Sequence, residues 1–596
     1  MRLVGPNCFG IAIPSLGLNA TFAGAQPTPG SAGLVMQSGG IAIAVLDHLT
    51  RLGIGVSSFA SVGDKYDVSS NDMLMWWEQD EATRLALLYV ESFGSPRRFA
   101  QTARRVGRKF PVLTVIGGRS AAGQRAAASH TAAAATPLVT QEALFSQAGV
   151  IATTSLGELV DAAALLACQP LPGGNRVAIV SNAGGAGVLA ADACGDNGLK
   201  VATLSEATQA RLRTLLPGGS AVANPIDTSA AVSQPAFRSC LENVAKDSGV
   251  DAVIAITVPT ALGHLTPAIL AAATTKPLVA VTLDQQESVT LLHGTHIQSS
   301  RAGQADQRAG GPADGAIPSF LYPESAARAL GHSVRYRQWR SKEEGQVPEL
   351  SEIRQHDAQR LVAKFLATHH LGGWLPPDQA AMLLTCYGIR LVPNLEAAGA
   401  DAAAEAACRL GGVPVVLKAD VPGLVHKTDA GAVLLDLRTE EDVRRGYGEL
   451  AGRFGADLRR VLVQPMINDG VEVLIGVVHE PVFGPLVVFG LGGVATDVLG
   501  DHAAKLTPLT DVDARELIGG IKAAPLLYGH RGSAAVDLDS LADLLLRVSR
   551  LADEIPEVAE LDLNPVIARA DAASPVDVRI RIVPAEPQDP FLRRLR

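Results

Sequence analysis

The chain has 596 residues, of which 47% are hydrophobic and 19% charged, with a formal net charge of -9 and a pI of about 5.8. This length exceeds what one hydrophobic core supports, so we expect three or four globular domains. The acidic balance and an aromatic content of 4% argue against a nucleic-acid-binding protein. Dispersed cysteines without a CxxC pair, no signal peptide and no long apolar run predict a cytoplasmic protein without disulfides, zinc or a membrane anchor.

The chain opens in what reads as the middle of a fold. Residues 4–10, VGPNCFG, combine the end of a strand with Gly-Pro-Asn turn chemistry. We therefore expect 1–28 to be the remnant of a domain whose larger part precedes it, or the product of a truncated reading frame.

The first Gly-rich turn lies between a strand and a helix. A short strand at 33–37 leads into Ser38, Gly39 and Gly40, and an apolar helix follows from 41 to about 52. This order presents backbone N–H groups and the positive end of a helix to an anion, so the three turn residues are candidates for binding phosphate. Close packing is the alternative explanation, because such turns also simply let elements approach each other.

The same layout occurs a second time. A strand at 176–180 is followed by Ser181, by Gly184 and Gly185, and by a helix that starts near 188. Two similar Gly-rich helix starts in successive α/β units are more informative than either alone. We therefore predict a second doubly wound domain that also contributes to phosphate binding.

A histidine in a small-residue loop is the candidate phosphoryl acceptor. The apolar strand 111–116 leads into the Gly- and Ala-rich stretch 117–135, which carries His130. A neutral imidazole nitrogen is a good nucleophile near pH 7. Another strand, 85–90, ends in Glu91 at the same predicted sheet edge, where it can orient His130. The alternatives are an ordinary loop histidine and a solvated surface glutamate.

The last part of the chain carries candidate nucleotide ligands. A strand at 414–418 ends in Lys418, and the Gly-rich loop 423–431 contains His426 and Lys427. A cationic mobile loop of this kind suits nucleotide phosphates. We also assign Glu472 to the nucleotide site.

Near the end of the chain, a strand carries a candidate metal site. Asp562 and Asn564 lie two residues apart, which places both oxygen ligands on one face of the strand. This spacing suits magnesium bridged to nucleotide phosphates. Ordinary surface polarity would produce the same pattern.

Taken together, these residues resemble the NDP-forming acyl-CoA synthetase family, which includes ADP-forming acetyl-CoA synthetase and relatives of succinyl-CoA synthetase. The resemblance covers nearly the whole chain. The motifs that carry it are Gly-Pro-Asn-Cys at 5–8, Gln-Ser-Gly-Gly at 37–40, Tyr-Val-Glu at 89–91, Gly-Arg-Ser at 118–120, Ser-His-Thr at 129–131, Ser-Asn-Ala-Gly-Gly at 181–185, Asn-Pro-Ile-Asp at 224–227, His-Lys-Thr-Asp at 426–429, Phe-Gly-Pro at 483–485 and Leu-Asp-Leu-Asn-Pro at 561–565.

The resemblance implies an α/β fold with two flavodoxin-like doubly wound domains, an ATP-grasp domain, and only the tail of a CoA-binding Rossmann domain. The expected ranges are a remnant at 1–28, ligase domains at 29–170 and 171–345, a linker at 346–375 and the ATP-grasp domain at 376–596.

The resemblance also implies roles. His130 matches the phosphorylated histidine, Glu91 the carboxylate that orients it, and His426 a second histidine that relays the phosphoryl group. Lys418 looks like the ATP-grasp phosphate lysine, and Asp562 and Asn564 like the magnesium ligands. The implied enzyme is an acid–thiol ligase that converts a small carboxylic acid, CoA and ATP, or another nucleoside triphosphate, into acyl-CoA, ADP and phosphate.

Two departures leave other functions open. Ile116 stands where family members usually have Lys, and Ala132 stands where they usually have Gly. A catalytically weak sensing module for acyl-CoA or nucleotide, belonging to a protein lysine acetyltransferase with its acetyltransferase domain upstream, remains an alternative, as does the remnant of a broken gene. We expect a homo-oligomer that binds neither nucleic acid nor membrane.

Overall fold

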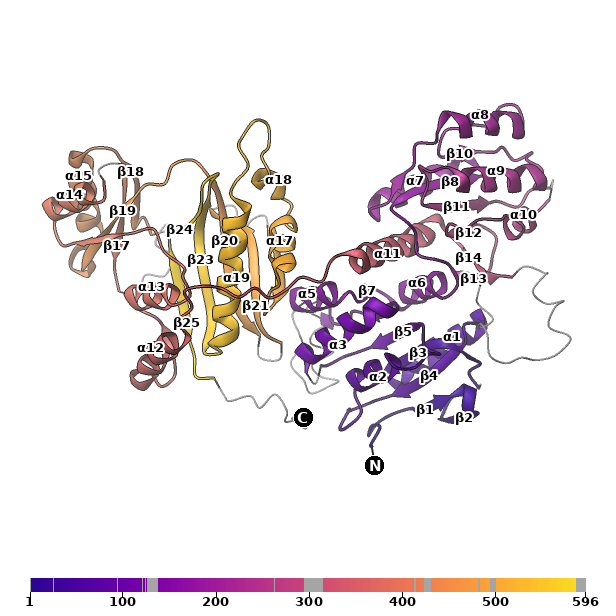
Figure 1. The fold of residues 1–596 in the computed structure, drawn as a ribbon, viewed down its shortest axis with the longest axis horizontal. Coiled ribbons are helices and arrows are strands. Elements are labelled where there is room, and N and C mark those ends of the chain that lie inside the picture. The colour runs from indigo at the N-terminus through magenta and orange to yellow at the C-terminus, as the bar shows by residue number, and fades with distance from the viewer. Residues whose placement is uncertain are drawn as a thin grey trace. The chain divides into compact units, whose positions relative to one another are not determined.

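The computed structural model describes residues 2–24, 26–93, 95–120, 122–123, 125, 138–261, 263–293, 315–411, 414–422, 430–480, 483–493 and 500–585. The chain forms two compact units (Figure 1). Unit 1 extends to Glu343, and unit 2 begins at Glu344. No helix in the described ranges is long and apolar enough to cross a membrane.

The first sheet of unit 1 has seven strands in the order β2-β1-β4-β3-β5-β6-β7. The strands from β3 to β7 run parallel, whereas β1 pairs antiparallel with β2 and β4. These strands are β1 (Gly10–Ile13), β2 (Leu18–Thr21), β3 (Pro29–Met36), β4 (Val56–Ser61), β5 (Leu85–Tyr89), β6 (Val112–Val115) and β7 (Ile151–Thr153). The helices are α1 (Gly39–Leu52), α2 (Ser70–Trp77), α3 (Pro96–Lys109), α5 (Leu138–Ala148) and α6 (Leu156–Cys168).

The second sheet of unit 1 follows the order β10-β8-β11-β12-β14-β13, with β9 paired to β8. Its strands are β8 (Arg176–Ser181), β9 (Lys200–Val201), β10 (Ile226–Asp227), β11 (Ala252–Thr257), β12 (Leu278–Thr282), β13 (Val289–Leu292) and β14 (Ile317–Phe320). The helices are α7 (Gly184–Asp196), α8 (Glu206–Leu215), α9 (Gln234–Lys246), α10 (Thr266–Leu270) and α11 (Pro323–Ser341).

Burial on both faces explains why these strands are apolar along their whole length. Every residue of β4, β6 and β11 is buried, as expected for parallel strands covered by helices on both sides. One cluster of buried side chains joins the two sheets, with Leu34 and Ile179 from the strands and Leu159 and Leu330 from α6 and α11. The two α/β layers of unit 1 therefore share a core.

Unit 2 contains two sheets. The large one has the order β15-β25-β23-β20-β21-β22, with β24 paired to β23, and the small one has the order β16-β19-β17-β18. The large sheet comprises β15 (Gly373–Trp374), β20 (Val471–Glu480), β21 (Gly484–Leu491), β22 (His502–Leu506), β23 (Val558–Ala568), β24 (Ala573–Pro575) and β25 (Val578–Ile582). The small sheet comprises β16 (Leu395–Ala397), β17 (Val415–Asp420), β18 (Val433–Leu437) and β19 (Arg460–Pro465).

Helices cover both sheets of unit 2 (Figure 1). They are α12 (Gln355–Thr368), α13 (Pro377–Thr385), α14 (Ala400–Arg409), α15 (Glu440–Phe454), α17 (Asp511–Gly519), α18 (Ala524–Leu527) and α19 (Leu538–Glu554). Two of them begin with hydroxyl N-caps: Thr439 caps α15 and Thr510 caps α17, and both form capping boxes with an aspartate at the third helical position. The amphipathic α19 buries Leu541, Leu545 and Val548 against the large sheet.

Candidate active site

Three of the predicted site residues, His130, His426 and Lys427, lie outside the described residues. Their roles stay predictions. The remaining candidates fall into two groups, one at the carboxyl ends of the strands of unit 1 and one between the two sheets of unit 2.

The start of α1 is open at the carboxyl end of β3. Ser38 is the N-cap residue in an extended conformation, and its side chain makes no capping hydrogen bond among the described residues. A Cβ atom added to Gly40 would meet nothing within 4 Å, and one added to Gly39 would lie 3.5 Å from the Phe9 side chain. The first N–H groups of α1 are therefore accessible to an anion, as the sequence predicts.

Glu91 lies in a turn that one glutamine side chain fixes. The Gln37 Oε1 atom accepts hydrogen bonds from the backbone N–H groups of Glu91, at 2.9 Å, and Ser92, at 3.1 Å. The Gln37 Nε2 atom donates to Ser92 Oγ at 3.1 Å. Because Gln37 directly precedes Ser38, the candidate phosphate turn and the candidate carboxylate are physically joined.

Lys65 reaches the same turn from the end of β4. Its ammonium group donates to the Ser92 hydroxyl, at 2.8 Å, and to the Ser92 carbonyl oxygen. Burial lowers the pKa of Lys65 to about 8, although the Glu91 charge acts in the opposite direction. A lysine with a pKa this close to neutral at a sheet edge is typical of functional sites.

Tyr89 links Glu91 to the start of the histidine-bearing stretch. Burial raises the pKa of Tyr89 to about 12, and the charge of Glu91 and a hydrogen bond to its carboxylate add to this effect. A Cβ atom on Gly117, the first residue of that stretch, would lie 4.0 Å from the Tyr89 hydroxyl. The loop after β6 therefore departs from the sheet beside the Tyr89–Glu91 pair.

The second predicted phosphate turn has different surroundings. The Ser181 hydroxyl donates to the Ala183 carbonyl at 2.8 Å and accepts from the Ala183 N–H group at 3.0 Å, so it stabilises the turn itself. A Cβ atom on Gly184 would lie 2.8 Å from Asp227 Oδ2. A carboxylate thus already faces the start of α7, where negative charge is favourable. This turn also contains Gly185. Among the described residues, no hydrogen bond connects the turn to the start of α1.

The motif at 224–227 contributes a strand to the second sheet. Its last two residues, Ile226–Asp227, form β10, which runs parallel to β8. The Asn224 amide accepts from the Ile179 N–H group and donates to the carbonyls of Val177 and Ala202. These bonds replace missing ladder contacts, which is why a short polar segment can join the sheet.

In unit 2, Lys418 extends from β17 toward the segment before β25. Its side chain is buried, and its Nζ atom lies 3.4 Å from the Val576 carbonyl and 4.0 Å from Asp577 Oδ2. Gln464 on β19 donates to the same Val576 carbonyl at 3.2 Å, and its buried Oε1 atom has no hydrogen-bond partner among the described residues. A buried cation and an unsatisfied amide oxygen on one sheet face are features that a ligand site commonly has.

The predicted metal ligands lie on β23. Asp562 and Asn564 alternate with the fully buried Leu561 and Leu563, so both face away from the core of the large sheet. Asp562 Oδ1 is buried and has no hydrogen-bond partner in the part of the chain that the structure describes. Burial raises the pKa of this carboxyl group, with Arg579 opposing and Asp577 adding to the rise. An unsatisfied carboxylate oxygen close to a second carboxylate suits a divalent cation.

These residues fit magnesium better than a metal held by the protein alone. Among the described residues, no group of three or more His, Cys, Asp and Glu side chains could hold a metal ion. Mg²⁺ is usually bound by one or two carboxylates together with substrate phosphates, which is what Asp562, Asn564 and the neighbouring Asp577 would provide. Glu472 on β20 is exposed, and its carboxylate lies beside Gly493.

Sequence reasoning did not include Gln37, Lys65, Tyr89, Gln464 or Asp577 in the site. Lys65 could have been found by the pattern that identified Glu91, because it too is a charged residue shortly after a buried strand. Gln37 and Tyr89 lie inside motifs that the resemblance uses. The contacts of Gln464 and Asp577 depend on how β19 and β25 face each other in unit 2, which no local pattern shows.

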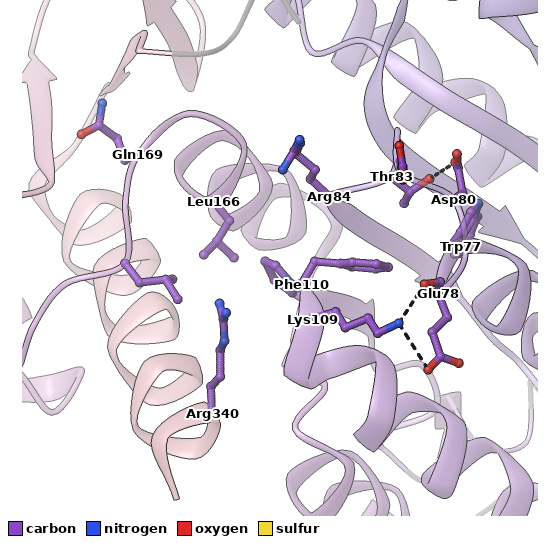
Figure 2. A pocket seen from close by; sticks show the side chains of 13 residues that line it. Trp77, Glu78, Asp80, Thr83, Arg84, Lys109, Phe110, Leu166, Gln169 and Arg340 are labelled. Carbon is purple, nitrogen blue, oxygen red and sulfur yellow. Dashed lines mark hydrogen bonds and ion pairs between the residues drawn. The ribbon is translucent and has the colours of Figure 1, made fainter. Parts of the chain in front are cut away.

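A cavity of about 320 Å³ in unit 1 is separate from these residues (Figure 2). Arg84 and Phe110, which line it, precede β5 and β6, so the cavity lies at the amino ends of these strands, opposite the edge that carries Glu91. Within it, Lys109 donates to the Glu78 carbonyl at 3.0 Å. None of the predicted site residues lines this cavity.

Comparisons with known proteins identify the family. A succinyl-CoA ligase like flavodoxin domain matches residues 29–166, a Ligase-CoA domain matches 177–292, and an ATP-grasp domain matches 367–582. These matches confirm the predicted fold class of two flavodoxin-like domains followed by an ATP-grasp domain.

Two relatives match almost the whole chain, and a third matches part of it. Acetate–CoA ligase [ADP-forming] I of Archaeoglobus fulgidus is 34% identical over 585 residues, which are 97% of this chain and 82% of the relative. The 4-hydroxybutyrate–CoA ligase [ADP-forming] of Nitrosopumilus maritimus is 31% identical and covers 97% and 82%. The beta subunit of acetate–CoA ligase [ADP-forming] I of Pyrococcus furiosus is 38% identical over 211 residues, 35% of this chain and 90% of the subunit. The chain therefore belongs to the ADP-forming acyl-CoA synthetases, the acid–thiol ligase family that its motifs predict.

Proposed function

We propose that this chain interconverts a carboxylic acid, CoA and ATP with an acyl-CoA, ADP and phosphate through a phosphohistidine at His130. The observation that carries this proposal is the hydrogen-bonded group of Gln37, Glu91, Tyr89 and Lys65. It joins a carboxylate to an open helix start and lies beside the first residue of the histidine-bearing stretch.

The phosphoryl group would move in two transfers. In the synthetic direction, a ring nitrogen of His130 accepts the terminal phosphoryl group of ATP, and ADP leaves. A carboxylate oxygen of the acid then accepts it, which gives an acyl phosphate and regenerates the neutral histidine. The Glu91 carboxylate accepts a hydrogen bond from the N–H group of the other His130 ring nitrogen, so that the attacking nitrogen keeps its lone pair. Ser38, Gly39 and Gly40 bind the phosphate with backbone N–H groups.

The thioester forms in the last step. The CoA thiol loses its proton to solvent, its thiolate sulfur attacks the acyl carbon of the acyl phosphate, and inorganic phosphate leaves with the electron pair of the broken C–O bond. The second turn, with Ser181, Gly184 and Gly185, would receive a phosphate group on its α7 N–H groups. Asp227 beside that helix start disfavours a fully ionised phosphate, so we propose that this turn binds the group less tightly than the start of α1.

Unit 2 supplies the nucleotide half of the reaction. Lys418 would bind nucleotide phosphates, and Asp562 and Asn564, with Asp577 beside them, would hold Mg²⁺, which neutralises phosphate charge when bound. The unsatisfied oxygens of Asp562 and Gln464 support this assignment. We assign His426, Lys427 and Glu472 to the same site as proposals.

The regulatory alternative is not favoured, because relatives named as ligases match 97% of this chain. We also propose the domain ranges 1–28, 29–170, 171–345, 346–375 and 376–596, a homo-oligomeric state, and, for the regulatory alternative alone, an upstream acetyltransferase domain. The two relatives act on different acids by name, so acetate and 4-hydroxybutyrate are the first acids to assay.

Phosphorylation of the full chain tests the proposal. Incubation with γ-labelled ATP and Mg²⁺ should give an acid-labile, base-stable phosphoprotein, and His130→Ala should lose most of the label. His264→Ala, which changes an exposed histidine of the second α/β layer, is the matched control and should label like the wild type. Wild-type labelling of His130→Ala would contradict the role of this histidine.

A further inference from the structure

The turn that carries Glu91 is held by three neighbouring strands. In the order β4-β3-β5, β3 is the central strand, and Gln37 directly follows it. The Gln37 amide uses its oxygen for two backbone N–H groups of the turn and its nitrogen for Ser92 Oγ. The Gln37 backbone N–H group also donates to the Tyr89 carbonyl at 3.0 Å, which extends the β3–β5 ladder to the last residue of β5.

Lys65 holds the same turn from the other side of β3. Its ammonium group must extend past the end of β3 to reach both oxygens of Ser92. Its own backbone is constrained, because Lys65 has a φ of 53° and its N–H group donates to the Val62 carbonyl at 2.9 Å. A Cβ atom on Gly63 would lie 2.2 Å from the Pro6 carbonyl, so only glycine fits there. The base of the Lys65 turn is therefore packed tightly.

Both contacts converge on one residue. Ser92 Oγ is bonded to Gln37 Nε2 and to Lys65 Nζ, and the Ser92 N–H and carbonyl groups are bonded to the same two side chains. Such a set of bonds fixes the position of the preceding residue, Glu91, far more firmly than a surface turn requires. A desolvated ammonium group is costly to bury, and a fold that needed only a stable turn would not require one.

We propose that Gln37 and Lys65 are positioning residues for phosphoryl transfer: they form a clamp on Ser92 that holds the Glu91 carboxylate where it orients the catalytic histidine. This inference rests on the proposed function. The hydrogen bond from the clamp to Glu91 involves the backbone N–H group, while the Glu91 carboxylate bonds to Tyr89 and attracts the Lys65 ammonium group. A displacement of about 1 Å at such a carboxylate is enough to slow a positioned reaction by about 100-fold.

The experiment compares two clamp variants with two matched controls in the full chain. Gln37→Leu and Lys65→Met remove the clamp. Gln169→Leu removes an amide that also links backbone groups, donating to Ala316 and accepting from Leu278, and Lys276→Met removes an ammonium group bonded to the Asp247 carbonyl. These control variants remove hydrogen bonds of a similar kind at positions away from the candidate site.

The measured quantities are the first-order rate of phosphoenzyme formation from labelled ATP, its dependence on ATP concentration, and the midpoint of thermal unfolding. We expect the clamp variants to phosphorylate about 10- to 100-fold more slowly at saturating ATP, with an unchanged half-saturating ATP concentration. Lys65→Arg keeps the charge and the donors, and it should recover most of the rate. Gln37→Glu is the substitute if the leucine variant does not fold. It keeps both accepted bonds but adds a charge beside Glu91, and it should also slow the reaction.

Three results would overturn the inference. If the wild-type chain takes up label and both clamp variants do so at the wild-type rate, the clamp inference is wrong while the proposed function stands. Equal losses of rate in the clamp variants and in the controls, in proportion to their unfolding midpoints, would show that Gln37 and Lys65 are only structural. A wild-type chain that takes up no label would overturn the proposed function, and the clamp with it.

Discussion

His332 Nε2 lies 2.6 Å from the Glu158 carboxylate oxygen Oε1, and both side chains are buried where α11 packs on α6. Burial alone would raise the pKa of Glu158, but hydrogen bonds from His332 and Thr154 hold it at about 2. Arg335 contacts the other ring nitrogen of His332 at 3.0 Å. This pair joins the two α/β layers of unit 1 through polar groups as well as through the shared core.

His332→Leu should therefore destabilise the protein strongly. The substitution leaves Glu158 buried without its partner, which typically costs about 3–5 kcal/mol. Chemical denaturation followed by a probe in unit 1 measures this loss. The double variant Glu158→Leu, His332→Leu removes both buried polar partners and should recover most of the stability. A single variant as stable as the wild type would mean that the pair contributes nothing to the interface.

Asp161→Asn should stabilise the protein at neutral pH. Burial raises the pKa of Asp161 to about 6, opposed by Ser325 and Arg328, against an ordinary value of 3.8. Between these two values the folded state binds more protons than the unfolded state, so the stability contribution falls as pH rises from about 4 to 6. The asparagine variant should gain in thermal midpoint over the wild type at pH 7 and lose that gain near pH 4. An equal difference at both pH values would contradict the shifted titration.

Lys418→Ala should weaken ATP binding without unfolding unit 2. Loss of one charge-assisted hydrogen bond to phosphate costs about 1.5–3 kcal/mol, or about 10- to 150-fold in affinity. Calorimetry with the full chain and Mg²⁺–ATP measures this change. Lys364→Ala, at an exposed position on α12, is the control and should bind ATP as the wild type does. Equal affinities in both variants would remove Lys418 from the nucleotide site.

Asp562→Asn should have opposite effects on stability and on the metal requirement. Because burial raises the pKa of Asp562, ionising this carboxyl group costs stability in the absence of metal, and the neutral amide removes that cost. The variant should therefore unfold at a higher temperature without Mg²⁺. It should also need a higher Mg²⁺ concentration for autophosphorylation, because an anionic ligand is lost. The control is Glu560→Gln, on the same strand as Asp562, which changes a partly exposed carboxylate that pairs with Arg581 of β25. It should change neither property by much.

The alternation of apolar strands and helices was enough to predict the doubly wound layers, because burial on both faces makes parallel strands apolar throughout. Glu91 could be placed at the correct sheet edge for the same reason, since its strand is plainly apolar. Lys65 could not be linked to it. The two residues are 26 positions apart, and the contact through Ser92 depends on β4 lying next to β3 and β3 next to β5, an order that the sequence does not contain.

The ATP-grasp half shows the same limit. The spacing of Asp562 and Asn564 correctly places both on one strand face, because side chains alternate along a strand. Asp577 follows a separate short strand, and its proximity to Lys418 arises only when the small sheet faces the segment before β25. The predicted roles of His130, His426 and Lys427 fall on residues outside the described ranges and stay predictions.

The antiparallel hairpin of β1 and β2 decides where the first sheet ends. All six residues of β4 are buried, and β4 would be the outermost strand if β1 did not pair with it. With the hairpin in place, the sheet ends in β2, which has four residues, and in β7, which has three. Such short edge strands offer few free backbone groups to another chain, which limits edge-to-edge aggregation. The hairpin thus covers part of the edge of a fully buried strand that would otherwise be open to a second molecule.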